Sequence, residues 1–239
     1  MQINWNIIKL VLTLLIAVFL FAFSSNKNTR RVVETINIEF VDNTHPFLTE
    51  ENVSKLLIQK NGQVTGVPKE ILDLNVLEIA LKKNPIIKNA EVYMSVNGKL
   101  TARIEQKTPI ARVNTNASFY IDESGSYMPL SSNFSARVPL VTGRIQKDRL
   151  ENVFEVAKKV YDDAILSKYV TEIHQEDKNT ISLTLRQNSF KVYLGEVESL
   201  DQKFNNLKAF YQKALKDKTL NTYSKVNLQF GNQVVCTKK

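Results

Sequence analysis

The sequence predicts an α+β protein that has one N-terminal membrane helix and then a body of mixed strands and helices. Two observations support this prediction. Residues 7–23 form the run IIKLVLTLLIAVFLFAF, in which only Lys9 and Thr13 are not apolar. Beyond residue 31, stretches that alternate apolar and polar residues, as strands do, are interspersed with stretches whose apolar residues recur at helical spacing.

The apolar run has the length of a membrane span. Counted from Ile3 it holds about 20 residues, or roughly 30 Å of helix, which matches the hydrocarbon core of a bilayer. Its Leu, Ile, Val and Phe residues favour insertion by about 4 to 8 kcal/mol, enough to offset one Thr and a Lys that can snorkel outward. We therefore expect residues 1–6 in the cytoplasm, a membrane helix at 7–23, a linker at 24–31, and the body outside the cytoplasmic membrane.

Two alternatives stay open for this segment. Ala22 to Ser24 has the small-x-small form of a signal-peptide cleavage site, but the run exceeds the 7–15 or so residues of a signal core, which favours an uncleaved anchor. A strict count of positive charges, with Lys27, Arg30 and Arg31 after the span, would keep the body in the cytoplasm. Anchor and signal both export the body.

Composition describes an ordinary globular body. The chain is 43% hydrophobic and 23% charged, as globular proteins are. The roughly 210 residues outside the membrane suggest one large or two small domains. Its net charge of +8 is concentrated in residues 203–239, where eight lysines face one acid, Asp217. Such a tail suits anionic lipid, an acidic partner or nucleic acid, or is only a solvated lysine-rich face. We see no base-reading pattern and expect no nucleic acid.

The first part of the body predicts a strand followed by two helices. ETINIEF, at 34–40, alternates as a half-buried strand does. Thr49 is placed to cap a first helix, whose first turn is acidic. Asn75, with Glu78 three residues later, resembles a capping arrangement for a second helix.

A hairpin then follows. Apolar residues alternate over 90–96 and again over 100–104, and Asn97-Gly98 between them predicts a type I′ turn. The resulting order of strand, helix, helix, strand, strand over 32–107 is the order of a POTRA domain, a fold of exported proteins that act on protein partners.

Residues 108–239 predict a second domain rich in sheet. We expect two hairpins, a helix capped by Asp148, an amphipathic helix near 200–215, and two last strands around Gly231-Asn232. The hairpins are predicted at 119–121 with 127–130 and at 181–185 with 190–194, and the last strands at 226–230 and 233–236. The basic amphipathic helix either packs on the sheet, which we favour, or lies on a membrane.

Catalytic chemistry finds little support. The two histidines, His45 and His174, stand far apart without carboxylates at metal-ligand spacing. The chain lacks a Gly-rich phosphate loop and a nucleophile-elbow motif. Cys236 has no neighbouring His and is interpreted as a buried or tolerated thiol. We expect no enzyme activity, no cofactor, no metal and no small-molecule substrate, and keep an anchored wall hydrolase as an alternative.

An ordered set of short motifs resembles the bacterial cell-division family FtsQ/DivIB. The similarity begins with the single span and the POTRA-like segment and continues nearly to the end of the chain. The motifs are PIIKNAEV at 85–92, EQKTPIA at 105–111, PLVTG at 139–143, YLG at 193–195 followed by KFNNL at 203–207, and VNLQF at 226–230. Val113 departs from the aromatic residue that often follows the junction between the domains.

The resemblance implies a non-catalytic scaffold of the division complex, with the body outside the inner membrane at the septum. Such proteins bind the single-span coiled-coil proteins FtsB and FtsL through the domain after POTRA. A chain that ends in a strand leaves an open edge, to which a partner can add a strand. We expect the contacts at Tyr223, Lys225, Phe230, Gln233, Val234 and Val235, unless some of these only fill the core. The alternative function is a POTRA-bearing export or assembly factor, although a series of membrane barrel strands is missing.

Overall fold

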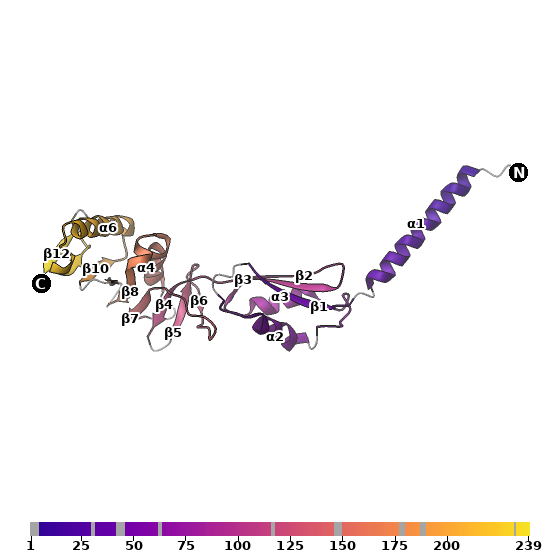
Figure 1. Ribbon diagram of the computed structural model, residues 1–239, viewed down its shortest axis with the longest axis horizontal. Helices are drawn as coiled ribbons and strands as arrows, with labels where there is room; N and C mark the ends of the chain where they lie inside the picture. Colours follow the sequence, from indigo (N-terminus) through magenta and orange to yellow (C-terminus); the bar gives the residue numbers. More distant parts are fainter. Residues whose placement is uncertain are drawn as a thin grey trace. The chain divides into compact units, whose positions relative to one another are not determined.

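The computed structural model describes residues 5–29, 32–41, 46–61, 64–115, 118–145, 150–176, 180–186, 190–231 and 233–239. The chain divides into two units, Met1–Gln106 and Lys107–Lys239, and each has its own sheet (Figure 1). The predicted α+β fold class is confirmed.

The N-terminal helix α1 spans Trp5–Thr29. Its stretch Lys9–Asn26 is long and apolar enough to cross a membrane and has no buried residues, properties that an anchor and a signal sequence share. The helix continues through most of the segment that we expected to be a linker. Residues 24–29 contain neither Pro nor Gly, and extending a helix that is already formed adds one hydrogen bond for each residue fixed.

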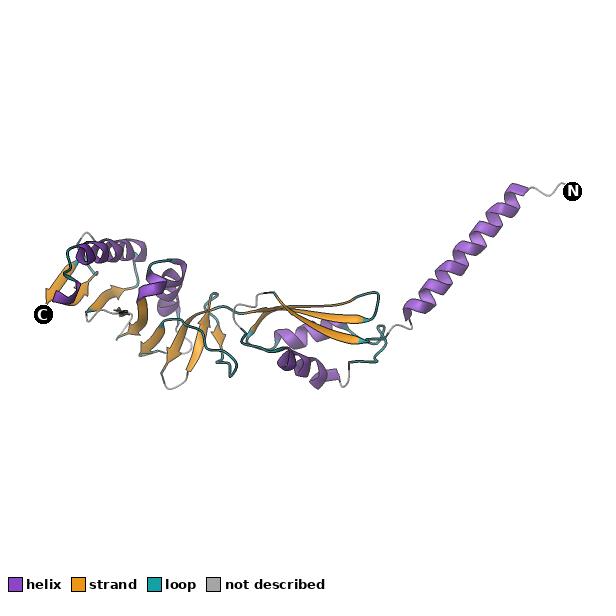
Figure 2. Cartoon of the chain, viewed as in Figure 1, coloured by secondary structure: helices purple, strands orange, loops and turns teal. Residues whose placement is uncertain are grey.

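The first unit holds a three-stranded sheet in the order β1-β3-β2. Strand β1 (Thr35–Phe40) runs parallel to β3 (Lys99–Gln106), and β2 (Ile87–Met94) runs antiparallel to β3. Helices α2 (Glu50–Asn61) and α3 (Leu74–Lys82) lie on the same side of this sheet (Figure 2). The predicted element order is confirmed. The buried core between the layers includes Val53, Leu57, Leu77, Leu81, Leu100 and Ile104.

Two local predictions for this unit are wrong. Asp73, not Asn75, caps α3, because its Oδ1 accepts the amides of Asn75 at 3.0 Å and of Val76 at 3.3 Å. Glu78 instead accepts the amide of Val92 at 2.8 Å and ties α3 to β2.

The hairpin turn is also not type I′. Only Gly98 has a positive φ, +78°, whereas a type I′ turn needs positive φ at both central residues. The Gly98 amide donates to the Ser95 carbonyl at 3.2 Å, and the Ser95 amide donates to the Lys99 carbonyl at 2.9 Å. The loop is therefore a three-residue loop, 96–98, that ends in the left-handed Gly98.

The second unit holds a nine-stranded mixed sheet in the order β12-β11-β10-β9-β8-β7-β4-β5-β6. The pairs β4–β7, β7–β8 and β10–β11 are parallel, and the others are antiparallel. The strands are β4 (Pro109–Asn114), β5 (Ser118–Asp122), β6 (Tyr127–Met128), β7 (Leu140–Gly143), β8 (Val170–Gln175), β9 (Thr180–Leu185), β10 (Lys191–Glu196), β11 (Tyr223–Asn227) and β12 (Val235–Lys238).

Helices α4 (Glu151–Asp162) and α6 (Leu200–Lys216) cover one side of this sheet (Figure 2). The short helix α5 (Leu166–Tyr169) precedes β8, and a 3-10 turn, η2 (Leu220–Thr222), precedes β11. Residues from both helices and from the central strands form one buried cluster, which includes Val156, Val160, Leu183, Val192, Phe204 and Leu207.

Both predicted hairpins, β5–β6 and β9–β10, and both long helices are confirmed. Strands β4, β7 and β8 were not predicted. The expected cap Asp148 and the turn residues 187–189 and Asn232 lie outside the described residues.

The last two strands have the predicted lengths but are displaced from the predicted ranges 226–230 and 233–236. Because β11 ends at Asn227 and β12 begins at Val235, Phe230, Gln233 and Val234 belong to the connection between them rather than to strands.

Candidate partner-binding edge

The C-terminal strand β12 lies at one edge of the nine-stranded sheet. It pairs with β11 on one side, and within the described residues no strand pairs with its other side. The Lys239 amide donates to the Thr222 carbonyl at 2.9 Å. Since backbone groups along an antiparallel strand point alternately to its two sides, Val235 and Thr237 also face β11, whereas Cys236 presents its N–H and C=O outward and Lys238 its N–H. The Lys238 carbonyl instead accepts Ser224 Oγ of β11.

The connection between β11 and β12 is held by helix α6. The Gly231 carbonyl accepts Nε2 of Gln202 at 2.6 Å and Nδ2 of Asn206 at 3.2 Å. At its start, the Leu228 amide donates to the Tyr193 carbonyl at 2.9 Å. The connection is therefore bonded to both the helix and the sheet, and β12 pairs with β11 in a defined register.

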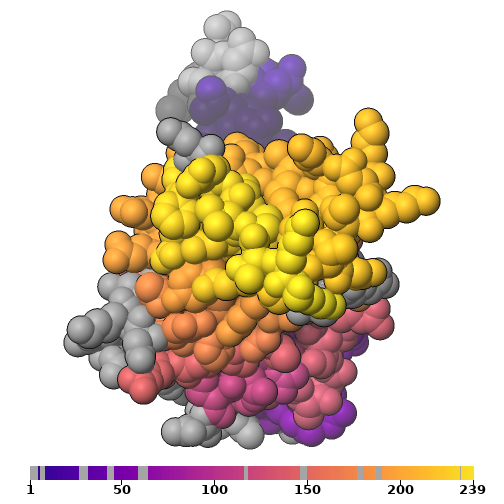
Figure 3. All heavy atoms as spheres, turned by 90° about the vertical axis from the view of Figure 1, so that its left-hand side faces the viewer, coloured from indigo at the N-terminus to yellow at the C-terminus, as the bar shows by residue number. Residues whose placement is uncertain are grey.

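The six predicted contact residues divide into two groups. Lys225, Phe230, Gln233 and Val235 are exposed, with Phe230 and Val235 at 46% and 40%, which is high for apolar side chains. Tyr223 and Val234 are half-buried and pack against the core of the unit, and the Tyr223 ring meets Phe210 edge-on at 5.5 Å. Four of the six are thus available at the surface, and two also serve the fold. Figure 3 shows this end of the chain, in yellow, at the molecular surface.

The edge is positively charged. Lys225, Lys238 and Lys239 are exposed, and the sequence from 218 to 239 contains no acidic residue. Lys225 Nζ lies 4.4 Å from the centroid of the Tyr193 ring, a cation–π contact. Ser224 Oγ donates to the carbonyls of Thr237 and Lys238 and joins the two strands, each at 3.2 Å. The edge therefore offers both hydrogen-bonding groups and charge to an acidic strand.

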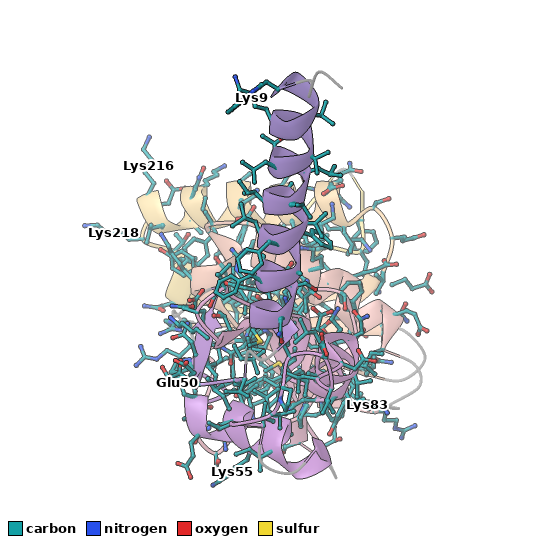
Figure 4. All side chains as sticks on the ribbon, turned by 90° about the vertical axis from the view of Figure 1, so that its right-hand side faces the viewer. Lys9, Glu50, Lys55, Lys83, Lys216 and Lys218 are labelled. Atoms are coloured by element: carbon teal, nitrogen blue, oxygen red, sulfur yellow. The ribbon has the colours of Figure 1, made fainter. Side chains whose placement is uncertain are left out.

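Helix α6 packs on the sheet, as favoured from its sequence. Lys203 is buried with the apolar face of the helix, and its Nζ donates to the Glu196 carbonyl at 2.7 Å. Burial lowers the pKa of Lys203, although Glu198 and Glu196 favour the charged form. Lys216 and Lys218 point away from the body (Figure 4).

Two other residues considered from the sequence are His174, which lies away from this edge, and Cys236, which is on β12 itself. His174 is on β8, where its Nδ1 lies 2.7 Å from Thr142 Oγ1, which also donates to Glu172 at 2.6 Å. Cys236 is half-buried, and burial raises the pKa of its thiol. In the part of the chain that the structure describes, no three His, Cys, Asp or Glu side chains are placed to hold a metal ion. His45 lies outside that part.

Sequence reasoning missed the contacts that hold the edge in place. Gln202, Asn206 and Tyr193 all act on the connection before β12. The motifs YLG and KFNNL contain Tyr193 and Asn206, so the signal was present, but nothing in either motif indicates a contact some 30 residues away in the chain.

Comparisons with known proteins agree with this architecture. Residues 108–237 match a family model described as "FtsQ/DivIB, C-terminal related", and residues 31–105 match one described as "POTRA-like domain". The cell division protein FtsQ of Salinibacter ruber is 25% identical over 169 residues, which cover 64% of this chain and 65% of that protein. The match thus spans slightly less than two thirds of the relative.

Proposed function

The chain belongs to the FtsQ/DivIB-related family, and we propose that it is a non-catalytic, single-pass scaffold of the bacterial division complex. In this proposal α1 anchors the protein in the inner membrane and the two sheet-bearing units lie on the exported side, at the septum. The scaffold supports septal wall synthesis by holding other division proteins together.

The proposed partner site is the outer side of β12. This strand offers outward-facing backbone groups at Cys236 and Lys238, and an added strand would satisfy them with main-chain hydrogen bonds. The open edge of β12 is the observation that carries the proposal, because edge strands that are neither covered nor paired invite strand addition.

Side chains around the edge would give this site its specificity. Phe230 and Val235 offer exposed apolar contacts, and Lys225, on the neighbouring strand β11, offers charge. We propose that the bound segment comes from FtsB- or FtsL-like single-span proteins and carries acidic residues opposite the lysines. Tyr223, Gln233 and Val234 complete the proposed contact set, with Tyr223 and Val234 acting partly through the core.

The decisive variants separate a backbone contact from a side-chain contact. Lys238→Pro removes an outward-facing N–H, whereas Lys238→Ala removes the charge and keeps the N–H. Neither change alters an amide that faces β11. Affinity for an FtsB–FtsL-type complex is measured by calorimetry on residues 28–239, with circular dichroism to confirm the fold.

Strand addition predicts that Lys238→Pro weakens binding at least tenfold and Lys238→Ala less than threefold. Equal losses would indicate a charge contact and contradict strand addition. A truncation that removes residues 224–239 is a poorer test, because it would remove Val226 and Leu228, which are fully buried. If wild-type protein failed to bind any such complex, the scaffold proposal would give way to the export or assembly factor.

A further inference from the structure

In the first unit, two loops flank the chain where it enters from α1. The Val33 amide donates to the Val67 carbonyl at 3.0 Å, and the Gly66 amide donates to the Val33 carbonyl at 2.8 Å. On the other side, the Glu34 amide donates to the Gly98 carbonyl at 2.9 Å. The loop at 64–73 and the hairpin turn at 95–98 therefore form the end of the unit that adjoins residues 32–34. We call this end the entry end.

Each of these loops carries an unusually exposed aliphatic side chain. Ile71 and Val96 are both 74% exposed, whereas no other large hydrophobic side chain described between 32 and 106 exceeds 54%. Ile71 belongs to the turn in which its amide donates to the Pro68 carbonyl at 3.0 Å, and Pro68 pairs with Val32 through a β-bridge. The two most exposed large apolar side chains described between 32 and 106 are thus both on loops bonded to the entering chain.

The chain length limits how far the entry end can lie from the membrane. From Thr29, the last residue of α1, to Val32 the chain spans at most about 10 Å. The helix from Phe23 to Thr29 adds roughly 9 Å. Val32, where the chain meets the entry end, therefore lies within about 20 Å of the edge of the apolar segment, and the headgroup layer fills about 5 to 8 Å of that distance.

We propose that the entry end rests on the bilayer, with Ile71 and Val96 inserted at the boundary between headgroups and acyl chains. This inference depends on the proposed role of α1 as an anchor. Charged side chains near the two tips are mixed in sign, with Lys69 and Lys99 beside Glu34 and Glu70, all in these loops or next to them. Burial of apolar surface is therefore the driving force, and neutral phospholipid suffices.

Such a contact would restrict the tilt of the unit. The anchor alone does not fix the tilt of the unit, whereas two additional lipid contacts define a plane. The opposite end of the sheet, where Ile87 pairs with Gln106, lies about 20 Å from the entry end along β3. Lys83, at the end of α3 nearest Ile87, is exposed there and is a matched position that should stay in water.

The test uses the full chain in phosphatidylcholine vesicles that contain a lipid with a nitroxide at carbon 5 of one acyl chain or, for the label at position 15 near the middle of the bilayer, at carbon 12. In a Cys236→Ser background, single cysteines are introduced by Ile71→Cys, Val96→Cys, Lys83→Cys and, within α1, Leu15→Cys. Each is labelled with bimane, and quenching by the nitroxide is measured. We expect at least twofold quenching at positions 15, 71 and 96 and less than 20% at position 83.

The outcomes separate the two proposals. If the label at position 15 were quenched, but the labels at 71 and 96 were quenched no more than the label at 83, the lipid contact would be overturned and the anchor would stand. Absence of quenching at 15 would overturn the anchor and the contact together. Quenching at 71 and 96 that appears only when anionic phosphatidylglycerol is added would overturn the apolar basis of the contact.

Discussion

The ammonium group of Lys225 lies 4.4 Å from the centre of the Tyr193 ring, on the neighbouring strand. Lys225 is paired in register with Lys191, and Tyr193 with Asn227, so the lysine side chain reaches along the sheet to the ring. This contact holds the positive charge over β10, on the side of β11 that is away from β12, and Lys225 is exposed there. Its position, rather than any contribution to folding, makes Lys225 the most informative residue of the candidate site.

Reversing the charge of Lys225 should weaken partner binding without unfolding the protein. An exposed cation–π contact contributes about 0.5–1 kcal/mol, so Lys225→Glu should lower the free energy of unfolding by no more than about 1 kcal/mol. Affinity for an acidic FtsB-type segment should fall at least tenfold, because attraction becomes repulsion. Calorimetric titration and thermal unfolding measure the two effects separately.

Lys216→Glu is the matched control, since Lys216 is also exposed and points into solvent, but from α6 (Figure 4). The same change of charge there should alter affinity by less than twofold. Equal losses for the two variants would show that only net charge matters and would remove Lys225 from the site.

A methyl group at Gly195 should disturb the connection before β12. Gly195 has φ of +75°, and a Cβ there would lie 2.6 Å from Cγ of Gln229. We expect Gly195→Ala to destabilise the second unit by about 1–2 kcal/mol through the left-handed backbone alone. Because Gln229 must move, partner affinity should fall as well.

Gly231→Ala provides the comparison. Its backbone does not need a positive φ, and its Cβ would meet nothing closer than 3.9 Å. Chemical denaturation should show little change for this variant. If Gly231→Ala destabilised the unit as much as Gly195→Ala, the account of the Gly195–Gln229 contact would be wrong.

The ion pair of Asp122 and Lys107 should make the second unit sensitive to acid. Their side chains meet at 2.8 Å, with that of Asp122 only 3% exposed. Burial raises the pKa of Asp122, but hydrogen bonds from Lys107, Ser124 and Ser126 and the Lys107 charge together hold this pKa below its ordinary value. Because the folded pKa is depressed, the carboxylate contributes stability above the unfolded pKa of about 3.9, and this is lost as pH falls through the folded pKa.

Asp122→Asn should therefore cost about 3 kcal/mol at pH 7, since it leaves Lys107 without its ionic partner. The difference from wild type should shrink as pH falls below about 4. Urea unfolding at pH 7 and at pH 3 measures it. A difference that stayed constant over this range would mean that ionisation of Asp122 is unimportant.

The cap of α3 can be tested with two neighbouring substitutions. Asp73→Ala removes the side chain that accepts two amides of the first turn and should cost about 1 kcal/mol. Asn75→Ala should cost little. Hydrogen exchange over 74–82 should accelerate for the first variant and not for the second, and the reverse order would restore the cap predicted from the sequence.

Elements with a strong local pattern were predicted well. The hairpin of β9 and β10 has alternating apolar residues on both strands, and α4 shows its buried face directly in the spacing of Val153, Val156 and Val160. Strand β7 was missed because it is only four residues long and pairs with β4 and β8, which are far away in sequence. Strand β4 was missed because Pro109, Ile110 and Ala111 are all buried, so its start does not alternate.

At the candidate site, local pattern identified the last strands but not their limits. Phe230 continues the alternation of β11, yet the bonds from Gln202 and Asn206 to Gly231 hold the chain in a connection there. Alternation cannot reveal a contact made across the fold. For the same reason, the sequence led us to place the cap of α3 at Asn75 rather than at Asp73. Backbone geometry decides where a helix begins, and residue types only suggest it.

The most direct test of the proposed edge is to measure by NMR the hydrogen exchange of single amides in β12, with and without an FtsB–FtsL-type complex. Strand addition predicts that the outward-facing amides of Cys236 and Lys238 become strongly protected on binding, while Val235 and Thr237, already bonded to β11, change little. If the complex bound and the Cys236 and Lys238 amides exchanged as fast as before, the partner would not add a strand at this edge.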